Sequence, residues 1–132
     1  MPKYLLLLFL CMVGSNAYSI DGNMLLRNCQ IVEKAEQSDA DAFFLQWCFG
    51  YIQGVIDNDD TWYGLMSYDK NHTHDKGKYC LPEEPMPYTQ LARIVVKYLK
   101  EHPENLHWNG SALVHNALIK AFPVCRVIKP DH

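Results

Sequence analysis

Apolar side chains recur at helical spacing in four segments of the chain, which predicts four amphipathic helices. The first helix is expected from Gly22 to about Glu36. Asp21 or Asn23 would cap it, because a short polar side chain accepts hydrogen bonds from the free N–H groups of a first helical turn. Its apolar face holds Leu25, Leu26, Cys29 and Val32.

The second helix is expected to begin at Ser38 and to end near Asp59. Ser38 and Asp41 form a Ser-x-x-Asp pattern that resembles a capping box. The polar stretch that follows, Asp60 to Glu84, predicts a long loop, which is unusual in a small domain and is therefore either functional or contains a helical turn. The apolar face of the second helix holds Phe44, Cys48, Tyr51, Ile52, Val55 and Ile56.

The third and fourth helices follow this stretch. Thr89 is the expected cap of the third, which comes after Pro87 and stops at Pro103, since proline cannot continue a helix. Ser111 is the expected cap of the fourth, which ends at Pro123. No strand-like alternation extends over more than a few residues, so the sequence predicts an all-α fold, a compact bundle of about four helices. The two apolar faces are Leu91, Ile94, Val95, Tyr98 and Leu99, and Leu113, Val114, Ala117, Leu118 and Ala121.

The N-terminus has the three parts of a secretory leader. Lys3 is the positive start, Leu5 to Val13 is a short apolar stretch, and Ala17 ends a small-x-small cleavage site. The apolar stretch is too short to span a bilayer, which takes about 20 residues. We therefore expect a leader over residues 1–17, a single helical domain over residues 18–132, and export to the periplasm without a membrane anchor.

Four cysteines lie outside the expected leader, and an even count in an oxidising compartment is typical of disulfides. Cys29 lies nine residues before Ser38 and Cys48 ten residues after it, so the two face each other if the first two helices form a hairpin that turns near Ser38. Cys80 precedes the third helix and Cys125 follows the fourth, and these ends are neighbours in a second hairpin. The predicted pairs are Cys29–Cys48 and Cys80–Cys125; buried free cysteines are the alternative.

The formal net charge is −3 for the whole chain, and it becomes one unit more negative without Lys3. The sequence has no basic stripe, which argues against nucleic acid or anionic lipid as a partner. An acidic surface instead suits a basic protein partner, or it serves solubility alone.

Gly50 and Gly54 lie one turn apart inside the second helix, where each costs about 1 kcal/mol relative to alanine. A missing side chain lets another backbone come close. We therefore expect close intramolecular packing on this face, with a dimer seam as the alternative.

Acidic and aromatic residues are concentrated where the second helix gives way to the expected loop. Aromatic side chains among charges on an exposed segment are typical of protein-binding hot spots. The alternative is a solvated helix end with Trp62 packed onto the core. The predicted partner-binding residues are Asp57, Asp59, Asp60, Trp62, Tyr63 and Tyr68.

Other motifs give weaker signals. His72, His74 and Asp75 could be half of a metal site, but no second cluster of ligands lies nearby in the sequence, and a solvated loop is the better interpretation. Glu83 and Glu84 are adjacent between two prolines and cannot readily face one substrate from both sides. The sequence has no nucleophile motif and no phosphate-binding glycine loop. We therefore expect no metal, no cofactor and no enzymatic activity.

Five motifs, in order around the four cysteines, resemble the Rap/Tai family of immunity proteins of type VI secretion systems. They are Gly22-Asn-x-Leu-Leu-x-x-Cys29, Gly50-Tyr-Ile-x-Gly-Val55, Tyr79-Cys-Leu-Pro82, Val96-Lys-Tyr-Leu-x-x-His-Pro103 and Ala117-Leu-x-x-Ala-Phe-Pro123. The resemblance implies a small helical periplasmic protein, often a homodimer, that neutralises a peptidoglycan amidase by occluding its active-site cleft. We assign the occluding role to the region from Asp57 to Tyr79 on its composition, because the resemblance does not supply it.

Two other classes of function fit the same sequence. A periplasmic stress chaperone would expose apolar surface in acid and prevent aggregation without selecting a partner. An envelope adaptor of the same fold would have no toxin to neutralise, and a toxin gene next to its own would argue against that class.

Overall fold

The computed structural model describes residues 19–67 and 79–123. In these two stretches the chain forms helices and no strand, so the all-α prediction is confirmed, while the expected leader lies outside them. The elements are α2 (Gly22–Cys29), the 3-10 turn η1 (Gln30–Glu33), α3 (Asp39–Ser67), α4 (Tyr88–Glu101), the 3-10 turn η2 (Pro103–Asn105) and α5 (Gly110–Ala121).

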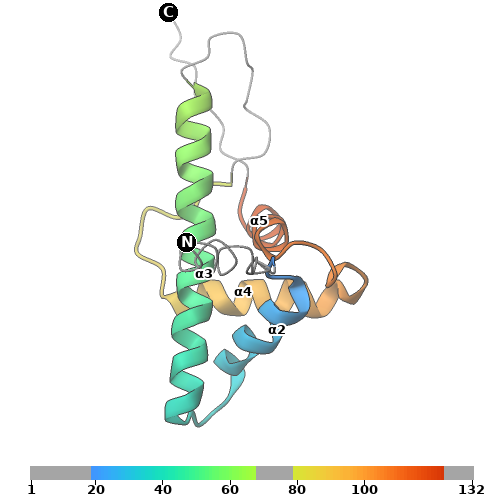
Figure 1. Cartoon of the computed structure of the whole chain (residues 1–132). Coiled ribbons are helices and arrows are strands. Elements are labelled where there is room, and N and C mark those ends of the chain that lie inside the picture. Colours follow the sequence, from blue (N-terminus) through green and yellow to red (C-terminus); the bar gives the residue numbers. More distant parts are fainter. Residues whose placement is uncertain (1–18, 68–78, 124–132) are drawn as a thin grey trace, which may run out of the picture.

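Helix α4 contacts α2, α3 and α5 and buries one face among them. Figure 1 shows it running across α3, with α2 and α5 beside it. Full burial of an aliphatic side chain stabilises the folded state by roughly 1.5 to 3 kcal/mol, so the buried face of α4 contributes much of the stability of the core. Its buried residues are Leu91, Ala92, Val95, Val96 and Leu99.

The first two helices begin where the sequence predicts. The Met24 N–H donates to Asp21 Oδ1 at 2.9 Å, which makes Asp21 the cap of α2. At the start of α3, the Asp41 N–H donates to Ser38 Oγ at 3.2 Å and the Ser38 N–H donates to Asp41 Oδ2 at 3.0 Å. This reciprocal pair is the predicted capping box.

The predicted caps of the other two helices are wrong. Asn109 caps α5, because its Oδ1 accepts the Ser111 N–H at 2.9 Å and the helix thus begins before Ser111. Pro87, and not Thr89, is the cap residue of α4, and its carbonyl accepts the Gln90 N–H at 2.9 Å. The first helix is also shorter than expected, since α2 ends at Cys29 and continues only as the 3-10 turn η1.

Helix α3 is longer than expected, and the predicted loop is wrong for residues 60–67, which are helical. Its buried residues are confined to positions 45–56, and none of the side chains described from 57 to 65 is buried. In Figure 1 the C-terminal end of α3 accordingly extends beyond the other helices. The Thr61 hydroxyl donates to the Asp57 carbonyl at 2.9 Å, so a residue expected in a loop instead bonds to the preceding turn.

The Cys29–Cys48 disulfide is present and links α2 to α3, with both cysteines fully buried. The hairpin argument from the sequence is therefore confirmed for this pair. Cys125 lies outside the described residues, so the structure describes one disulfide of the two expected, and the Cys80–Cys125 bridge stays a prediction. The Cys80 N–H donates to the Pro123 carbonyl at 2.9 Å, which brings the backbone just before Cys125 alongside Cys80.

Gly50 and Gly54 do not pack closely inside the protein, contrary to the prediction. A Cβ built on either glycine would meet no atom of the described residues within 4 Å. The described residues leave the face that carries both glycines uncovered, and this face forms one wall of a groove.

Candidate functional site

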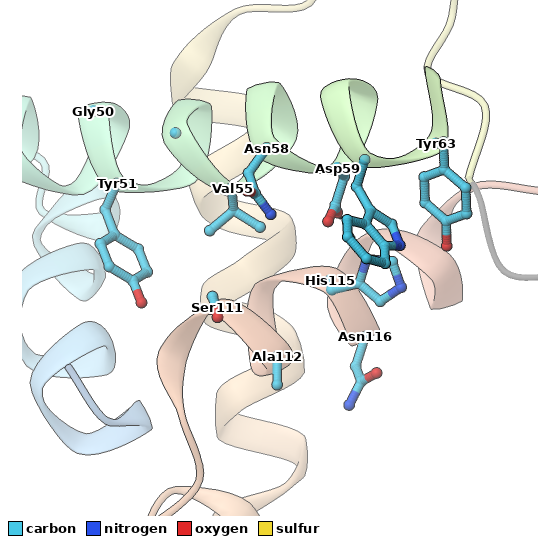
Figure 2. A pocket seen from close by; sticks show the side chains of 12 residues that line it. Gly50, Tyr51, Val55, Asn58, Asp59, Tyr63, Ser111, Ala112, His115 and Asn116 are labelled. Atoms are coloured by element: carbon cyan, nitrogen blue, oxygen red, sulfur yellow. Dashed lines mark hydrogen bonds and ion pairs between the residues drawn. The ribbon is translucent and has the colours of Figure 1, made fainter. Parts of the chain in front are cut away.

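A groove of about 790 Å³ lies between α3 and α5. Gly50, Gly54 and Val55 contribute to the α3 wall, and Ser111 and Ala112 contribute to the α5 wall. Figure 2 shows Asn58 and Asp59 projecting from α3 toward α5, and Asn116 and His115 on the opposite wall. The groove therefore combines an apolar base with amide, carboxylate and imidazole groups.

Asp59 connects the two walls of the groove. His115 Nδ1 lies 2.7 Å from Asp59 Oδ2, and the Tyr79 hydroxyl donates to the same oxygen at 3.1 Å. The Tyr79 ring meets the His115 ring edge to face, with centroids 5.7 Å apart. Only 16% of the Asp59 side chain and 26% of the His115 side chain are exposed, so solvent screens this contact less than it would a surface pair. The cluster thus joins α3, α5 and the segment that precedes α4.

The hydroxyls of two tyrosines near the groove have raised pKa values. Burial raises the pKa of Tyr79 well above its usual value, and the charge of Asp59 raises it further, because a second negative charge beside the carboxylate is unfavourable. Tyr79 therefore stays neutral and keeps its proton for Asp59. Burial also raises the pKa of Tyr51, and a hydrogen bond from the Ser111 backbone opposes that shift.

The groove contains an aspartate, a histidine and a serine, but they do not form a nucleophilic triad. In such a triad the serine hydroxyl must donate to the histidine. The Ser111 hydroxyl instead donates to Asn109 Oδ1 at 2.6 Å, as part of the cap of α5. The Asp59–His115 pair therefore has a structural partner in Tyr79, and Ser111 is not activated as a nucleophile by His115.

The comparison with protein families identifies the chain. The family model described as Rap1a immunity proteins matches residues 21–125. The chain belongs to the family of Rap1a immunity proteins. No curated protein and no solved structure matches it.

Membership in the Rap1a immunity family confirms the resemblance inferred from the sequence motifs. It implies a protein that binds a cognate effector toxin and inhibits it without catalysing a reaction. None of the helices in the described stretches has both the length and the apolar composition that crossing a bilayer requires.

The predicted partner-binding residues fall into two groups in this Rap1a family member. Asp59, Trp62 and Tyr63 come together and line the groove. Asp57 and Asp60 are exposed instead, and Asp57 Oδ1 accepts a hydrogen bond from Gln53 Nε2 at 2.8 Å. The side chain of Trp62 is exposed rather than packed onto the core, at 57% of its full area. Tyr68 lies outside the described residues.

Several residues of the groove were not predicted from the sequence. His115 and Asn116 lie on α5. Tyr79, which bonds to Asp59, lies within the stretch from Asp60 to Glu84 that the sequence predicts to be a loop. Tyr79 begins one of the five family motifs, but that motif carries no sign of a hydrogen bond to Asp59. The pairing of Asp59 with His115 spans 56 residues, so no local spacing rule indicates it.

The metal interpretation of the His72–Asp75 stretch concerns residues outside the described ones. Among the residues that the structure describes, no three His, Cys, Asp or Glu side chains are placed to hold a metal ion.

Proposed function

We propose that this protein is a periplasmic immunity protein that binds a peptidoglycan amidase delivered by a type VI secretion system and occludes its active-site cleft. The C-terminal end of α3 is the element that enters the cleft. One observation carries the proposal: α3 continues past its last buried residue, Ile56, to Ser67 and presents Trp62 and Leu65 to solvent at 57% and 65% exposure.

The composition of this projecting end suits a protein interface. Tryptophan is enriched among the residues that dominate binding energies, and the exposed carboxylates of Asp57 and Asp60 supply charge at the rim. The end is already helical, so binding need not order it. A preformed element loses less conformational entropy than a flexible loop would, and this favours affinity.

The cellular location rests on the leader and the cysteines. A leader over residues 1–17 would export a domain of residues 18–132, and the Cys29–Cys48 bridge suits an oxidising compartment. The proposal includes the second bridge, Cys80–Cys125, which the contact between Cys80 and Pro123 supports. The homodimer that the family resemblance implies is tested by measuring the mass of the purified protein in solution.

A periplasmic growth assay tests the function. The amidase encoded beside this gene is exported to the periplasm with and without the protein, and lysis is scored. Wild-type protein should prevent lysis. Lysis despite good expression of the wild type would contradict the proposal and favour the chaperone or the adaptor.

A pair of tryptophan variants tests the mechanism. Trp62→Ala should raise the Kd for the amidase by about 30-fold or more, because truncating a central aromatic residue costs about 2 kcal/mol or more. Trp108→Ala is the matched control, since Trp108 is also exposed, at 44%, but follows η2 away from the end of α3. Equal affinities of the two variants for the amidase would show that Trp62 is not part of the interface. Deletion of Tyr68–Lys76 tests the adjoining segment in the same assay.

A further inference from the structure

The groove between α3 and α5 adjoins the end of α3 that enters a cleft, and it shares Trp62 and Tyr63 with that end. Its wall on α3 runs from Gly50 to Tyr63, which is about 20 Å at 1.5 Å per residue. That length accommodates roughly six residues of extended polypeptide at about 3.3 Å each. The groove is therefore large enough to receive a segment of a partner protein.

The α3 wall has no projecting side chains at two positions, because Gly50 and Gly54 lie there. No atom of the described residues fills the space where side chains at Gly50 and Gly54 would project, so a partner backbone can approach the helix closely. The base near them is the buried Val55. Polar groups surround this apolar base, since Asn58 and Asn116 each present an amide. An entirely apolar segment would leave these amides without hydrogen bonds, which is unfavourable.

The negative charge of the groove favours a basic partner segment over an acidic one. Its described lining residues include the Asp59 carboxylate and contain neither lysine nor arginine. His115, the one basic side chain among these described residues, is already bonded to Asp59.

Aromatic rings complete the lining. Tyr51 and Trp62 lie at opposite ends of the α3 wall, and Tyr63 follows Trp62. A guanidinium or ammonium group is attracted to the face of such a ring, and arginine in particular stacks on it. Carboxylate, amide and aromatic groups together match the requirements of a basic side chain, whereas an acidic segment would meet like charge.

We propose that this groove binds a basic segment of the effector, with an arginine or lysine side chain placed between the aromatic rings and the carboxylate of Asp59. The inference rests on the proposed function, since the effector supplies the segment. The complex then has two contacts of opposite direction: the end of α3 enters the effector, and the effector enters the groove beside it.

Two pairs of variants test the groove, with the Kd for the amidase encoded beside the gene measured by calorimetry. Ala112→Trp fills the groove from α5 and should weaken binding by about 30-fold or more. Ala121→Trp adds the same bulk at another exposed alanine of α5, outside the groove, and should change the Kd by less than about twofold. Circular dichroism of both variants confirms that they fold.

The second pair tests the sign of the charge at one position. Asn116→Lys should weaken binding by about tenfold relative to Asn116→Asp, because like charges across an interface repel and opposite charges attract. Both substitutions replace the same half-buried amide with a charge, so their ratio largely cancels effects on the fold. The difference should shrink at high salt.

Each outcome decides the inference. Unchanged affinity in Ala112→Trp, with a wild type that binds, overturns the groove and leaves the proposed function standing. Tighter binding by Asn116→Lys than by Asn116→Asp overturns the basic segment. Failure of the wild type to bind the amidase overturns the proposed function and the inference together.

Discussion

Gly54→Ala should stabilise the protein, although the sequence alone predicts that this glycine is needed for close packing. A Cβ at Gly54 would meet no atom of residues 19–67 or 79–123 within 4 Å, so the substitution causes no clash with this part of the chain. Alanine loses less backbone entropy than glycine when a helix forms. The free energy of unfolding should therefore rise by about 1 kcal/mol, the difference between the two residues inside a helix.

Gly22→Ala provides a control of opposite sign in another helix. A Cβ at Gly22 would lie 2.5 Å from Leu113 Cδ1 and 2.9 Å from the Leu106 backbone. The leucine side chain can rotate, but the backbone contact is held by the bond from the Asn23 N–H to the Leu106 carbonyl, at 3.1 Å. Overpacking of this kind costs about 1 to 3 kcal/mol, so this variant should lose stability.

Urea unfolding followed by circular dichroism measures both changes. The m-value should stay constant, so that a shift of the midpoint reports stability alone. The measurement is repeated at two protein concentrations, because self-association would make the midpoint depend on concentration. A loss of stability in Gly54→Ala would refute the reasoning, since it would mean that something covers this face of α3 in solution.

Three further predictions concern the disulfide, the capping box and the tyrosine below the groove. Replacing both Cys29 and Cys48 with alanine should lower the free energy of unfolding by about 3 kcal/mol in a urea titration, because the disulfide closes a loop with a sequence separation of 19 and so restricts the unfolded chain. A loss below about 1 kcal/mol would contradict the loop-closure account. The pKa of Asp41 is lowered to about 2, chiefly by the hydrogen bond from Lys34, so the stability that the Asp41 carboxylate contributes is present above about pH 4 and is lost toward pH 2. Asp41→Asn should therefore be less stable than the wild type at pH 7 and equal to it near pH 2. A difference in stability that stays constant with pH would contradict this prediction. Tyr79→Phe should lower the free energy of unfolding by about 1.5 to 3 kcal/mol, because it removes the hydrogen bond to the Asp59 carboxylate. Because the pKa of Tyr79 is raised in the folded protein, wild-type stability should decline above about pH 10, while that of the variant declines less. Equal pH profiles of stability would disprove this role of Tyr79.

Features set by neighbouring residues were predictable from the sequence. The Asp21 cap and the Ser38–Asp41 box depend on groups three residues apart, so their pattern is visible in the sequence. The Cys29–Cys48 pair was predictable because equal distances from a turn place residues opposite each other in a hairpin of helices.

The length of α3 was not predictable by the same means. Aspartates, a threonine and a glycine after Ile56 are common in loops, and burial does not hold them in a helix. A helix that has already formed adds each further residue at little cost, because the unfavourable nucleation step is past. The first half of α3, which is buried and bonded to α2, supplies that nucleus, so the extension depends on distant packing that local composition does not reveal.

The candidate site was predictable only on the α3 side. Asp59, Trp62 and Tyr63 stand out as acidic and aromatic neighbours in the sequence, and all three line the groove. Their partners, His115 and Tyr79, come from other elements, and the packing of α5 against α3 brings His115 to Asp59.

The Asp59 cluster explains how α3 can project from the core and still keep a fixed direction. The core holds the helix only as far as Ile56, and a helix anchored at one point alone could swing at its free end. Asp59 adds a second anchor, to His115 on α5 and to the buried Tyr79, three residues before Trp62. Trp62 thus lies about 4.5 Å along the helix from a fixed point while its own side chain remains open to a partner. Loosening this anchor should therefore weaken effector binding even though neither His115 nor Tyr79 needs to enter the cleft.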